Sequence, residues 1–381
     1  MTTASSIPPE LLLEIFEWAT FYPDAYTTAY KPFCTTAFSE AQPTCRDTDI
    51  SYSLALVCRL WHALVTEFLY RDVRIGYRQS ALKGALCDKQ GYGRFVRRAV
   101  LPFQYTSTPT WSPAPLPSVE ILKFCHQLEV LIRPRSPPLS AVSQQFQFDA
   151  DSLPLPSLKR LEWNYNLDAE HSGGINSLGA TLQNAPNLQY LFIGCVPRSP
   201  MIDFRQISLP SLDTLAISCL SGQLMHQICY RWALPSLSHI VLGAVSVPDV
   251  STLWEVYGEQ IKSLELGRHA SFLVRDVITS ALNHCSQLEE LNYHMFFTLP
   301  PLLHESHDSI HTVGLHSAPN LMFMSDDAWM LLERHFETLI EYLSSLHTLR
   351  LFGDWSNILT DPRFAPIFVK LCQRECHLVV V

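Results

Sequence analysis

The stretch LPSLKRLEW, residues 155–163, decides the expected fold. Leu158 is followed three and five positions later by Leu161 and Trp163, and a Leu-Pro-Ser turn introduces the run. The same spacing of apolar residues begins again at residues 188, 212, 237, 261, 288, 310 and 346, and weaker copies begin at 96 and 128. Eight full matches indicate an internal repeat, and no single element explains them.

Starting points 22 to 36 residues apart lie within or near the period of leucine-rich repeats. A unit of this length cannot bury its own apolar face and has to stack on its neighbours. The pattern therefore predicts an α/β solenoid, with a parallel sheet on its concave face and helices on its convex face. Residues 271–285 and 329–343 have helical spacing, and residues 364–381 are expected to form a last helix and strand.

Strand alternation sorts the side chains of each repeat. The apolar positions point into the core, and the residues between them point out of the sheet. The outward residues form the predicted target-binding surface, on which Tyr190 and Phe192 are the expected exposed anchors, and His239, His294 and His316 are its possible pH-sensitive members. The residues assigned to target binding are Arg160, Glu162, Tyr190, Phe192, His239, Glu265, Glu290, His294, Arg350 and Phe352.

The amino-terminal stretch IPPELLLEIFEWA, residues 7–19, predicts a helix. Pro8 and Pro9 suit a first turn, and Glu10 favours the positive end of the helix dipole. Its apolar residues spread over roughly 220°, about double the arc that one packed face needs. The surplus is either covered by the chain itself or meant for another protein. Residues 52–75 repeat this helical pattern, and residues 20–49 are expected to be an inserted loop.

IPPELLLEIF followed by SLALVCRLWHALV resembles both halves of the F-box motif. The trailing LYRDVRI and RFVRRAVL resemble fungal F-box proteins with degenerate leucine-rich repeats. The insertion at about 20–50 departs from the motif, in which the connection is short, and Ile7 stands where Leu is commoner. The expected domains are a three-helix F-box unit at 1–75 and a repeat domain at 76–381.

The resemblance implies a docking surface for a Skp-family adaptor, which links F-box proteins to a cullin scaffold and a RING ubiquitin ligase. Ile15 and Trp61 suit either this interface or internal packing, because a three-helix unit needs its own core. The residues carried over by position, which would form or support the interface, are Ile7, Pro8, Pro9, Leu12, Ile15, Phe16, Leu54, Val57, Cys58 and Trp61.

Composition narrows the class of protein. A chain of 381 residues with 47% hydrophobic and 17% charged residues can bury a large core, and a net charge of −9 disfavours nucleic acid as a partner. No run reaches the roughly 18 apolar residues of a membrane span, and the first ten residues lack a secretory signal. Its 11 cysteines are expected to be reduced thiols in the cytoplasm or nucleus.

The sequence contains none of the catalytic motifs that would indicate an enzyme: it has no phosphate-binding Gly-rich loop, no Gly-x-Ser-x-Gly and no Cys-x-x-Cys. His304, His307, His311 and His316 have spacings that could hold a metal, but the His-Glu-x-x-His pattern is one residue short. Cys372, Cys376 and His377 lack a second pair of zinc ligands. We expect no cofactor and no metal.

These patterns together predict a non-catalytic substrate receptor of a cullin-RING ubiquitin ligase. Such a protein would bind a Skp-family adaptor through its helices and a target protein through its repeats. The alternatives are a leucine-rich-repeat scaffold outside the ubiquitin pathway, and a hydrolase or metalloenzyme built around the histidine cluster.

Overall fold

The computed structural model describes residues 7–34, 46–75, 79–87, 91–101, 118–133, 153–164, 177–194, 205–247, 249–270, 276–322 and 325–381, with the backbone alone at 46–49, 79, 118 and 325. The chain forms two compact units. Unit 1 comprises Met1–Ala29, Ala37–Arg198 and Ile207–Pro210, and unit 2 comprises Tyr30–Thr36, Ser199–Gln206 and Ser211–Val381. The division falls within the repeats, and the boundary at residue 75 stays a prediction.

Unit 1 combines amino-terminal helices with five parallel strands in the order β1-β2-β3-β4-β5. Its α-helices are α1 (Pro9–Thr20), α2 (Arg46–Ala55), α3 (Arg59–Arg71), α4 (Gln79–Cys87), α5 (Ser118–Leu122) and α6 (Leu178–Gln183). Its strands are β1 (Asp72–Arg74), β2 (Arg98–Val100), β3 (Val130–Arg133), β4 (Arg160–Asn164), β5 (Tyr190–Gly194) and the short β6 (Ile207–Ser208). Short 3₁₀ turns cover Pro23–Ala25 and Tyr92–Phe95.

Unit 2 continues the repeat with seven parallel strands in the order β7-β9-β10-β11-β12-β13-β14. The strands are β7 (Thr214–Ile217), β9 (His239–Ala244), β10 (Ser263–His269), β11 (Glu290–His294), β12 (Thr312–His316), β13 (Thr348–Phe352) and β14 (His377–Val380), with a short β8 (Trp232–Ala233). The helices are α7 (Gly222–Arg231), α8 (Ser251–Tyr257), α9 (Val277–His284), α10 (Ser325–Tyr342), α11 (Ser356–Thr360) and α12 (Ala365–Gln373). Turns of 3₁₀ helix lie at Gly258–Gln260, Met295–Phe297 and Pro362–Phe364.

The repeat prediction is confirmed at the level of strands. Each predicted motif supplies one strand, from β2 at residue 98 to β13 at residue 348, and the predicted last helix and strand are α12 and β14. The central apolar residues of the motifs are completely buried, as the alternation requires: Leu161, Leu191, Leu215, Ile240, Leu264, Leu291, Val313 and Leu349. Strand β1, which the repeat pattern did not predict, adds one more strand at the start.

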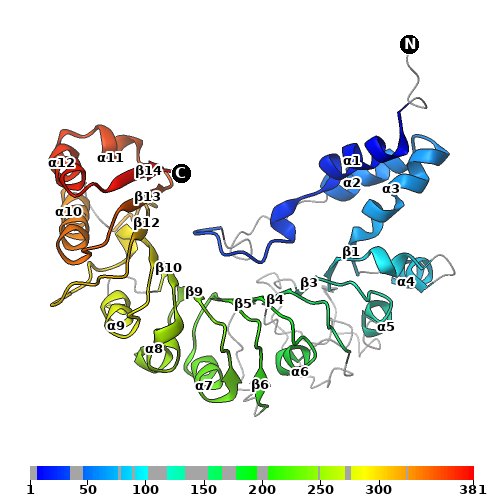
Figure 1. Cartoon of the computed structure of the whole chain (residues 1–381), viewed down its shortest axis with the longest axis horizontal. Coiled ribbons are helices and arrows are strands. Elements are labelled where there is room, and N and C mark those ends of the chain that lie inside the picture. The colour runs from blue at the N-terminus through cyan, green and yellow to red at the C-terminus, as the bar shows by residue number, and fades with distance from the viewer. Residues whose placement is uncertain are drawn as a thin grey trace. The chain divides into compact units, whose positions relative to one another are not determined.

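The strands of unit 2 run in register, so equivalent residues of successive repeats form rows across the sheet. One row contains Glu265, Asn292, Gly314 and Arg350. The row two residues further along contains His294, His316 and Phe352. Helices α7, α8 and α9 lie on one side of β9 and β10 (Figure 1). Leu264, Leu291 and Val313 alternate with these rows and are completely buried in the core, so the rows lie on the opposite face of the sheet, away from the helices. We call it the helix-free face of unit 2.

The amino-terminal helices differ in part from prediction. Helix α1 begins at Pro9, with proline in its first turn as expected. Residues 20–49 are not all loop, because α2 already begins at Arg46 and a 3₁₀ turn covers Pro23–Ala25. Residues 35–45 lie outside the described part. Helix α3 begins after Cys58, whose sulfur accepts a hydrogen bond from the backbone N–H of Trp61.

Candidate functional site

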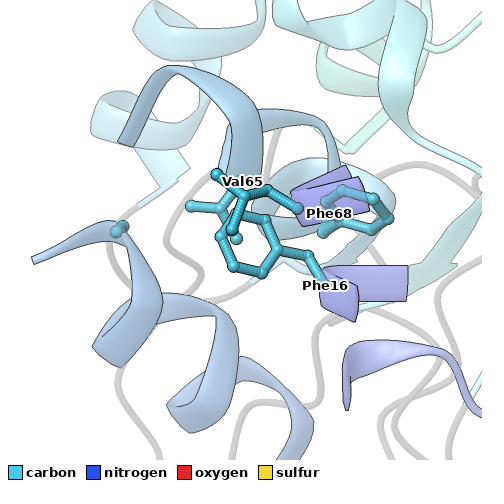
Figure 2. Close-up of a cluster of buried hydrophobic side chains, with 5 residues drawn as sticks. Phe16, Val65 and Phe68 are labelled. Carbon is cyan, nitrogen blue, oxygen red and sulfur yellow. The ribbon is translucent and has the colours of Figure 1, made fainter. Parts of the chain in front are cut away.

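The helices α1, α2 and α3 enclose a small core of their own. Leu12 and Phe16 from α1 meet Ala55 from α2 and Val65 and Phe68 from α3 (Figure 2). Helical spacing of four residues puts Leu12 and Phe16 on one side of α1, which explains why both are buried together. The sequence assigned both residues to forming or supporting an adaptor interface. Each is only 1% exposed, so neither contacts a partner directly and they can only support an interface from beneath.

Two further predicted interface residues also belong to this packing. Leu54 and Trp61 are partly buried against the core, and the rings of Trp61 and Phe16 meet edge to face with centroids 4.9 Å apart. For Trp61 the alternative left open by the sequence is thus decided largely in favour of internal packing.

A second side of α1 stays exposed. Leu11, Ile15 and Trp18 recur at helical spacing, within roughly 60° around the axis. They are 50%, 52% and 83% exposed. We call these three residues the α1 stripe. Of them only Ile15 was assigned from the sequence, although the same spacing could have found Leu11 and Trp18.

Further apolar residues are exposed where α2 leads into α3. Leu56 and Val57 lie in the turn, Leu60 lies in the first turn of α3, and all three are well exposed. Val57 was assigned to the adaptor surface from the sequence, whereas Leu56 and Leu60 were missed. The remaining assigned residues, Ile7, Pro8, Pro9 and Cys58, are also exposed. Exposed apolar residues that gather in this way commonly mark protein interaction sites.

Helix α1 is fixed to the end of α3 by Arg71. This side chain forms an ion pair with Glu17 of α1 at 3.4 Å, and its guanidinium lies over the rings of Phe68 and Phe21. Because Glu17 is exposed, the ion pair itself contributes little to stability. Its role is orientation, since it holds the α1 stripe in one position on unit 1.

In unit 1, the predicted target-binding residues of β4 are covered by the chain itself. Arg160 donates two hydrogen bonds to Glu162, at 2.9 and 2.6 Å. It also donates to the carbonyl oxygens of Thr27, at 2.7 Å, and Asp24, at 3.3 Å. Both charged side chains are buried, and the Arg160 guanidinium lies over the ring of Tyr190. The expected open surface is thus a satisfied buried ion pair.

The prediction that Tyr190 and Phe192 are exposed anchors is wrong. They are 7% and 1% exposed, respectively. Alternation along a strand predicts from which face of the sheet a side chain projects, but it does not predict whether another segment covers that face. These two residues contribute packing rather than accessible contact area.

In unit 2, residues 30–33 bind the helix-free face. The Tyr30 hydroxyl donates to Glu265 Oε2 at 3.0 Å, and the Phe33 backbone N–H donates to the same oxygen at 2.8 Å. Asn292 Nδ2 donates to the Tyr30 hydroxyl at 2.8 Å. The ring of Tyr30 lies 5.2 Å from the ring of His239. With the contacts of the Phe33 ring, five strands of the predicted target-binding surface, β9 to β13, meet one short segment of the same chain.

The ring of Phe33 fills an aromatic cage formed by His294, His316 and Phe352. The ring centroids are 5.1, 5.2 and 4.8 Å from that of Phe33, all in edge-to-face arrangements. Such contacts each stabilise a pair by about 1 kcal/mol beyond simple burial. His294 and Phe352 were both assigned to target binding from the sequence, and in the structure both contact Phe33 of the same chain.

Charge on this face is set mainly by burial. Burial raises the pKa of Glu265 to about 7, against the lowering effect of the hydrogen bonds from Phe33 and Tyr30, and the nearby Glu290 raises it further. Glu290 in turn pairs with Arg350 at 3.3 Å. Burial, assisted by His316, lowers the pKa of His294 to about 3. His294 is therefore neutral at ordinary pH, and burial also lowers the pKa of His316. Glu265, which was not among the expected pH-sensitive residues, changes its charge near pH 7.

Asn292 depends on a glycine in the next strand. Gly314 lies opposite Asn292 in register, and a Cβ atom at residue 314 would lie 2.0 Å from Asn292 Oδ1. No side chain larger than hydrogen fits there without moving the amide. Unit 1 repeats the arrangement, because a Cβ atom at Gly194 would lie 1.9 Å from Oδ1 of Asn164.

Three of the four histidines considered as metal ligands, all but His304, have other contacts. His307 Nε2 lies 3.1 Å from the carbonyl oxygen of Cys285, His311 stacks on His347, and His316 belongs to the cage. Cys376 is buried whereas Cys372 is exposed. Among the residues that the structure describes, no three His, Cys, Asp or Glu side chains come together as a metal site.

No protein-family model and no curated protein matches this chain. Among solved structures it is similar to a chain of the "Crystal structure of TLR13-ssRNA13 complex", with 16% sequence identity and a TM-score of 0.31. The likeness covers 69% of this chain and 37% of that chain. Across the described ranges, no helix has the length and apolar character needed to cross a membrane.

Proposed function

We propose that this chain is a protein-interaction scaffold that acts as a non-catalytic substrate receptor of a cullin-RING ubiquitin ligase. Helices α1–α3 would bind a Skp-family adaptor, and the strands of the repeats would select a target. The receptor contributes proximity, because a target held near a charged ubiquitin carrier meets it at a raised effective concentration. That role requires no nucleophile in this chain.

The observation that carries the proposal is the α1 stripe. A helix that buries Leu12 and Phe16 has already formed its core, and yet it exposes Leu11, Ile15 and Trp18 on another side. Tryptophan supplies more apolar contact area than any other side chain and is enriched at interface hot spots. Together with the resemblance of residues 7–16 and 53–65 to the F-box motif, the stripe supports a partner-covered rather than a free helix.

A pull-down with a Skp-family adaptor tests this function. The wild-type chain, co-expressed with the adaptor, is expected to co-purify with it. The double variant Leu11→Asp/Ile15→Asp is expected to bind at least tenfold more weakly, because charges then lie in an apolar interface. Leu321→Asp is the matched control, since Leu321 is 99% exposed in unit 2 and undergoes the same chemical change.

Circular dichroism of all variants checks that the helices persist. Loss of binding in both the stripe variant and the control, or equal binding by the stripe variant and the wild type, would contradict the assigned surface. A wild-type chain that never binds the adaptor would leave the scaffold outside the ubiquitin pathway as the better explanation.

A further inference from the structure

Residues 30–33 contact the helix-free face of unit 2 as a bound ligand would. The core of unit 2 lies on the other side of the sheet, where Leu264, Leu291 and Val313 are completely buried. The segment therefore does not complete that core. Its contacts with this face include the Tyr30 hydroxyl, the Phe33 backbone N–H and the rings of both residues.

The segment is held in a turn that its own sequence does not favour. Cys34 N–H donates to the carbonyl oxygen of Lys31 at 3.3 Å, which closes a four-residue turn with Pro32 in its second position. Phe33 occupies the third position with φ of 55°. Glycine or asparagine is usual there, and a bulky residue in this left-handed region is strained. The cage around the Phe33 ring offsets this strain.

The polar groups beneath the segment are only partly used by it. Glu265 accepts two hydrogen bonds from the segment, yet buried Nδ1 of His294 and Oδ1 of Asn292 have no hydrogen-bond partner among the residues that the structure describes. A buried polar atom without a partner destabilises the structure that contains it, because it has lost its hydrogen bonds to water. Another occupant of the same face could satisfy one of them and so bind better than residues 30–33 do.

We propose that the helix-free face of unit 2 is a peptide site, that its ligand presents a tyrosine followed three residues later by a phenylalanine in a tight turn, and that residues 30–33 occupy the site in its absence. This proposal rests on the target-binding part of the proposed function and specifies it. Glu265 and Asn292 bind the tyrosine hydroxyl, Glu265 also binds the turn N–H, and the aromatic cage binds the phenylalanine ring.

The same geometry excludes phosphotyrosine. The Tyr30 hydroxyl lies 3.0 Å from a Glu265 oxygen, and Asn292 Nδ2, which also bonds that hydroxyl, lies 3.0 Å from Glu290 Oε1. A phosphate group at the hydroxyl would bring a charge of about −2 against these two carboxyl groups. The site is therefore selective for the unmodified ring, which gives the test a ligand that differs by one group.

Covalent attachment makes residues 30–33 a strong competitor. A tethered segment reaches its site at an effective concentration on the order of millimolar. A free peptide with a dissociation constant of about 100 μM is then weakened about tenfold in the wild-type chain. Removal of the tethered side chains should restore its intrinsic affinity.

The experiment measures binding of a labelled peptide with the sequence of residues 29–34, Ala-Tyr-Lys-Pro-Phe-Ser, in which serine replaces Cys34. Fluorescence anisotropy compares the full-length wild type with the double variant Tyr30→Ala/Phe33→Ala. We expect the peptide to bind the double variant about tenfold more tightly than the wild type. The phosphotyrosine form, and a peptide with alanine in place of both rings, are expected not to bind. Adding Phe352→Ala to the double variant should weaken binding at least tenfold.

No binding to a folded double variant, or equal binding to both proteins, would overturn the proposal, and so would equal binding of the phosphorylated peptide. If the double variant does not fold, Tyr30→Phe replaces it, because this change keeps the ring and removes only the hydroxyl bonds. The Tyr30→Phe variant should then still bind the peptide more tightly than the wild type does. If it binds the peptide no more tightly, the proposal is wrong.

The adaptor-binding variant Leu11→Asp/Ile15→Asp separates the two proposals. Combined with Tyr30→Ala/Phe33→Ala, it should bind the peptide as the double variant does. Peptide binding without any adaptor binding would reject the ubiquitin-ligase role alone, whereas adaptor binding without peptide binding would reject only the site on unit 2.

Discussion

The α1 stripe and the helix-free face of unit 2 both lie on elements that the sequence assigns to partner binding, but they differ in exposure. Leu11, Ile15 and Trp18 are exposed in the part of the chain that the structure describes, whereas Glu265 and Asn292 are almost fully buried beneath residues 30–33. Periodicity gives the direction of a side chain relative to its own helix or strand. Whether another segment buries that side chain depends on residues far away in the sequence, so periodicity cannot predict it.

The largest expected effect separates the two sides of α1. Phe16→Ala should lower the free energy of unfolding of the helical unit by about 3–5 kcal/mol, because it leaves a cavity in a small core. Trp18→Ala, two residues away, should change it by no more than about 0.5 kcal/mol. Urea unfolding followed by circular dichroism measures both changes. Similar losses for both residues would mean that Trp18 is also part of a core.

The second expected effect concerns the pH dependence of unit 2. The pKa of Glu265 is raised from an ordinary 4.5 to about 7 in the folded chain. Between these pH values the folded chain holds the proton more tightly than the unfolded chain, so stability falls as pH rises from about 4.5 to 7 and then levels off. The fall corresponds to about 3 kcal/mol at most.

Glu265→Gln should remove this slope, because glutamine keeps a carbonyl acceptor and does not titrate. The groups that face Glu265 are Tyr30, the N–H of Phe33, and Glu290 with its partner Arg350. Thermal unfolding of both proteins at several pH values between 4 and 8 measures the difference. Parallel curves for the wild type and the variant would place the titrating group elsewhere.

The smallest expected effect tests the turn at Phe33. Phe33→Ala and Phe33→Gly both remove the ring from the cage, but only glycine adopts a φ of 55° without strain. The glycine variant should therefore be the more stable of the two by about 1 kcal/mol, which reverses the usual order of these residues. Urea unfolding midpoints of the two variants give the comparison. An alanine variant that is the more stable would show that the turn does not persist.

Much of the fold could be read from the repeat, because the spacing of three and five residues marks the buried side of β2 to β5, β7 and β9 to β13, whereas the short strands β6 and β8 lie outside the motifs. The packing of residues 30–33 on β10 to β13 could not be predicted, because Tyr30 and Glu265 are 235 residues apart and no periodic pattern links them. One signal was present. Phe21, Tyr22, Tyr26, Tyr30 and Phe33 place five aromatic rings in a stretch expected to be loop, and so many rings usually need a surface to pack on.

The contact between Asn292 and Gly314 restricts which substitutions the sequence can accept during evolution. Since a single methyl group at residue 314 would displace the amide that holds the Tyr30 hydroxyl, neither position can be substituted independently of the other. Substitution of Gly314, which lies two strands away from Glu265, would therefore weaken the binding of any segment to the helix-free face. Substitutions at positions 292 and 314 are therefore expected to covary among related sequences.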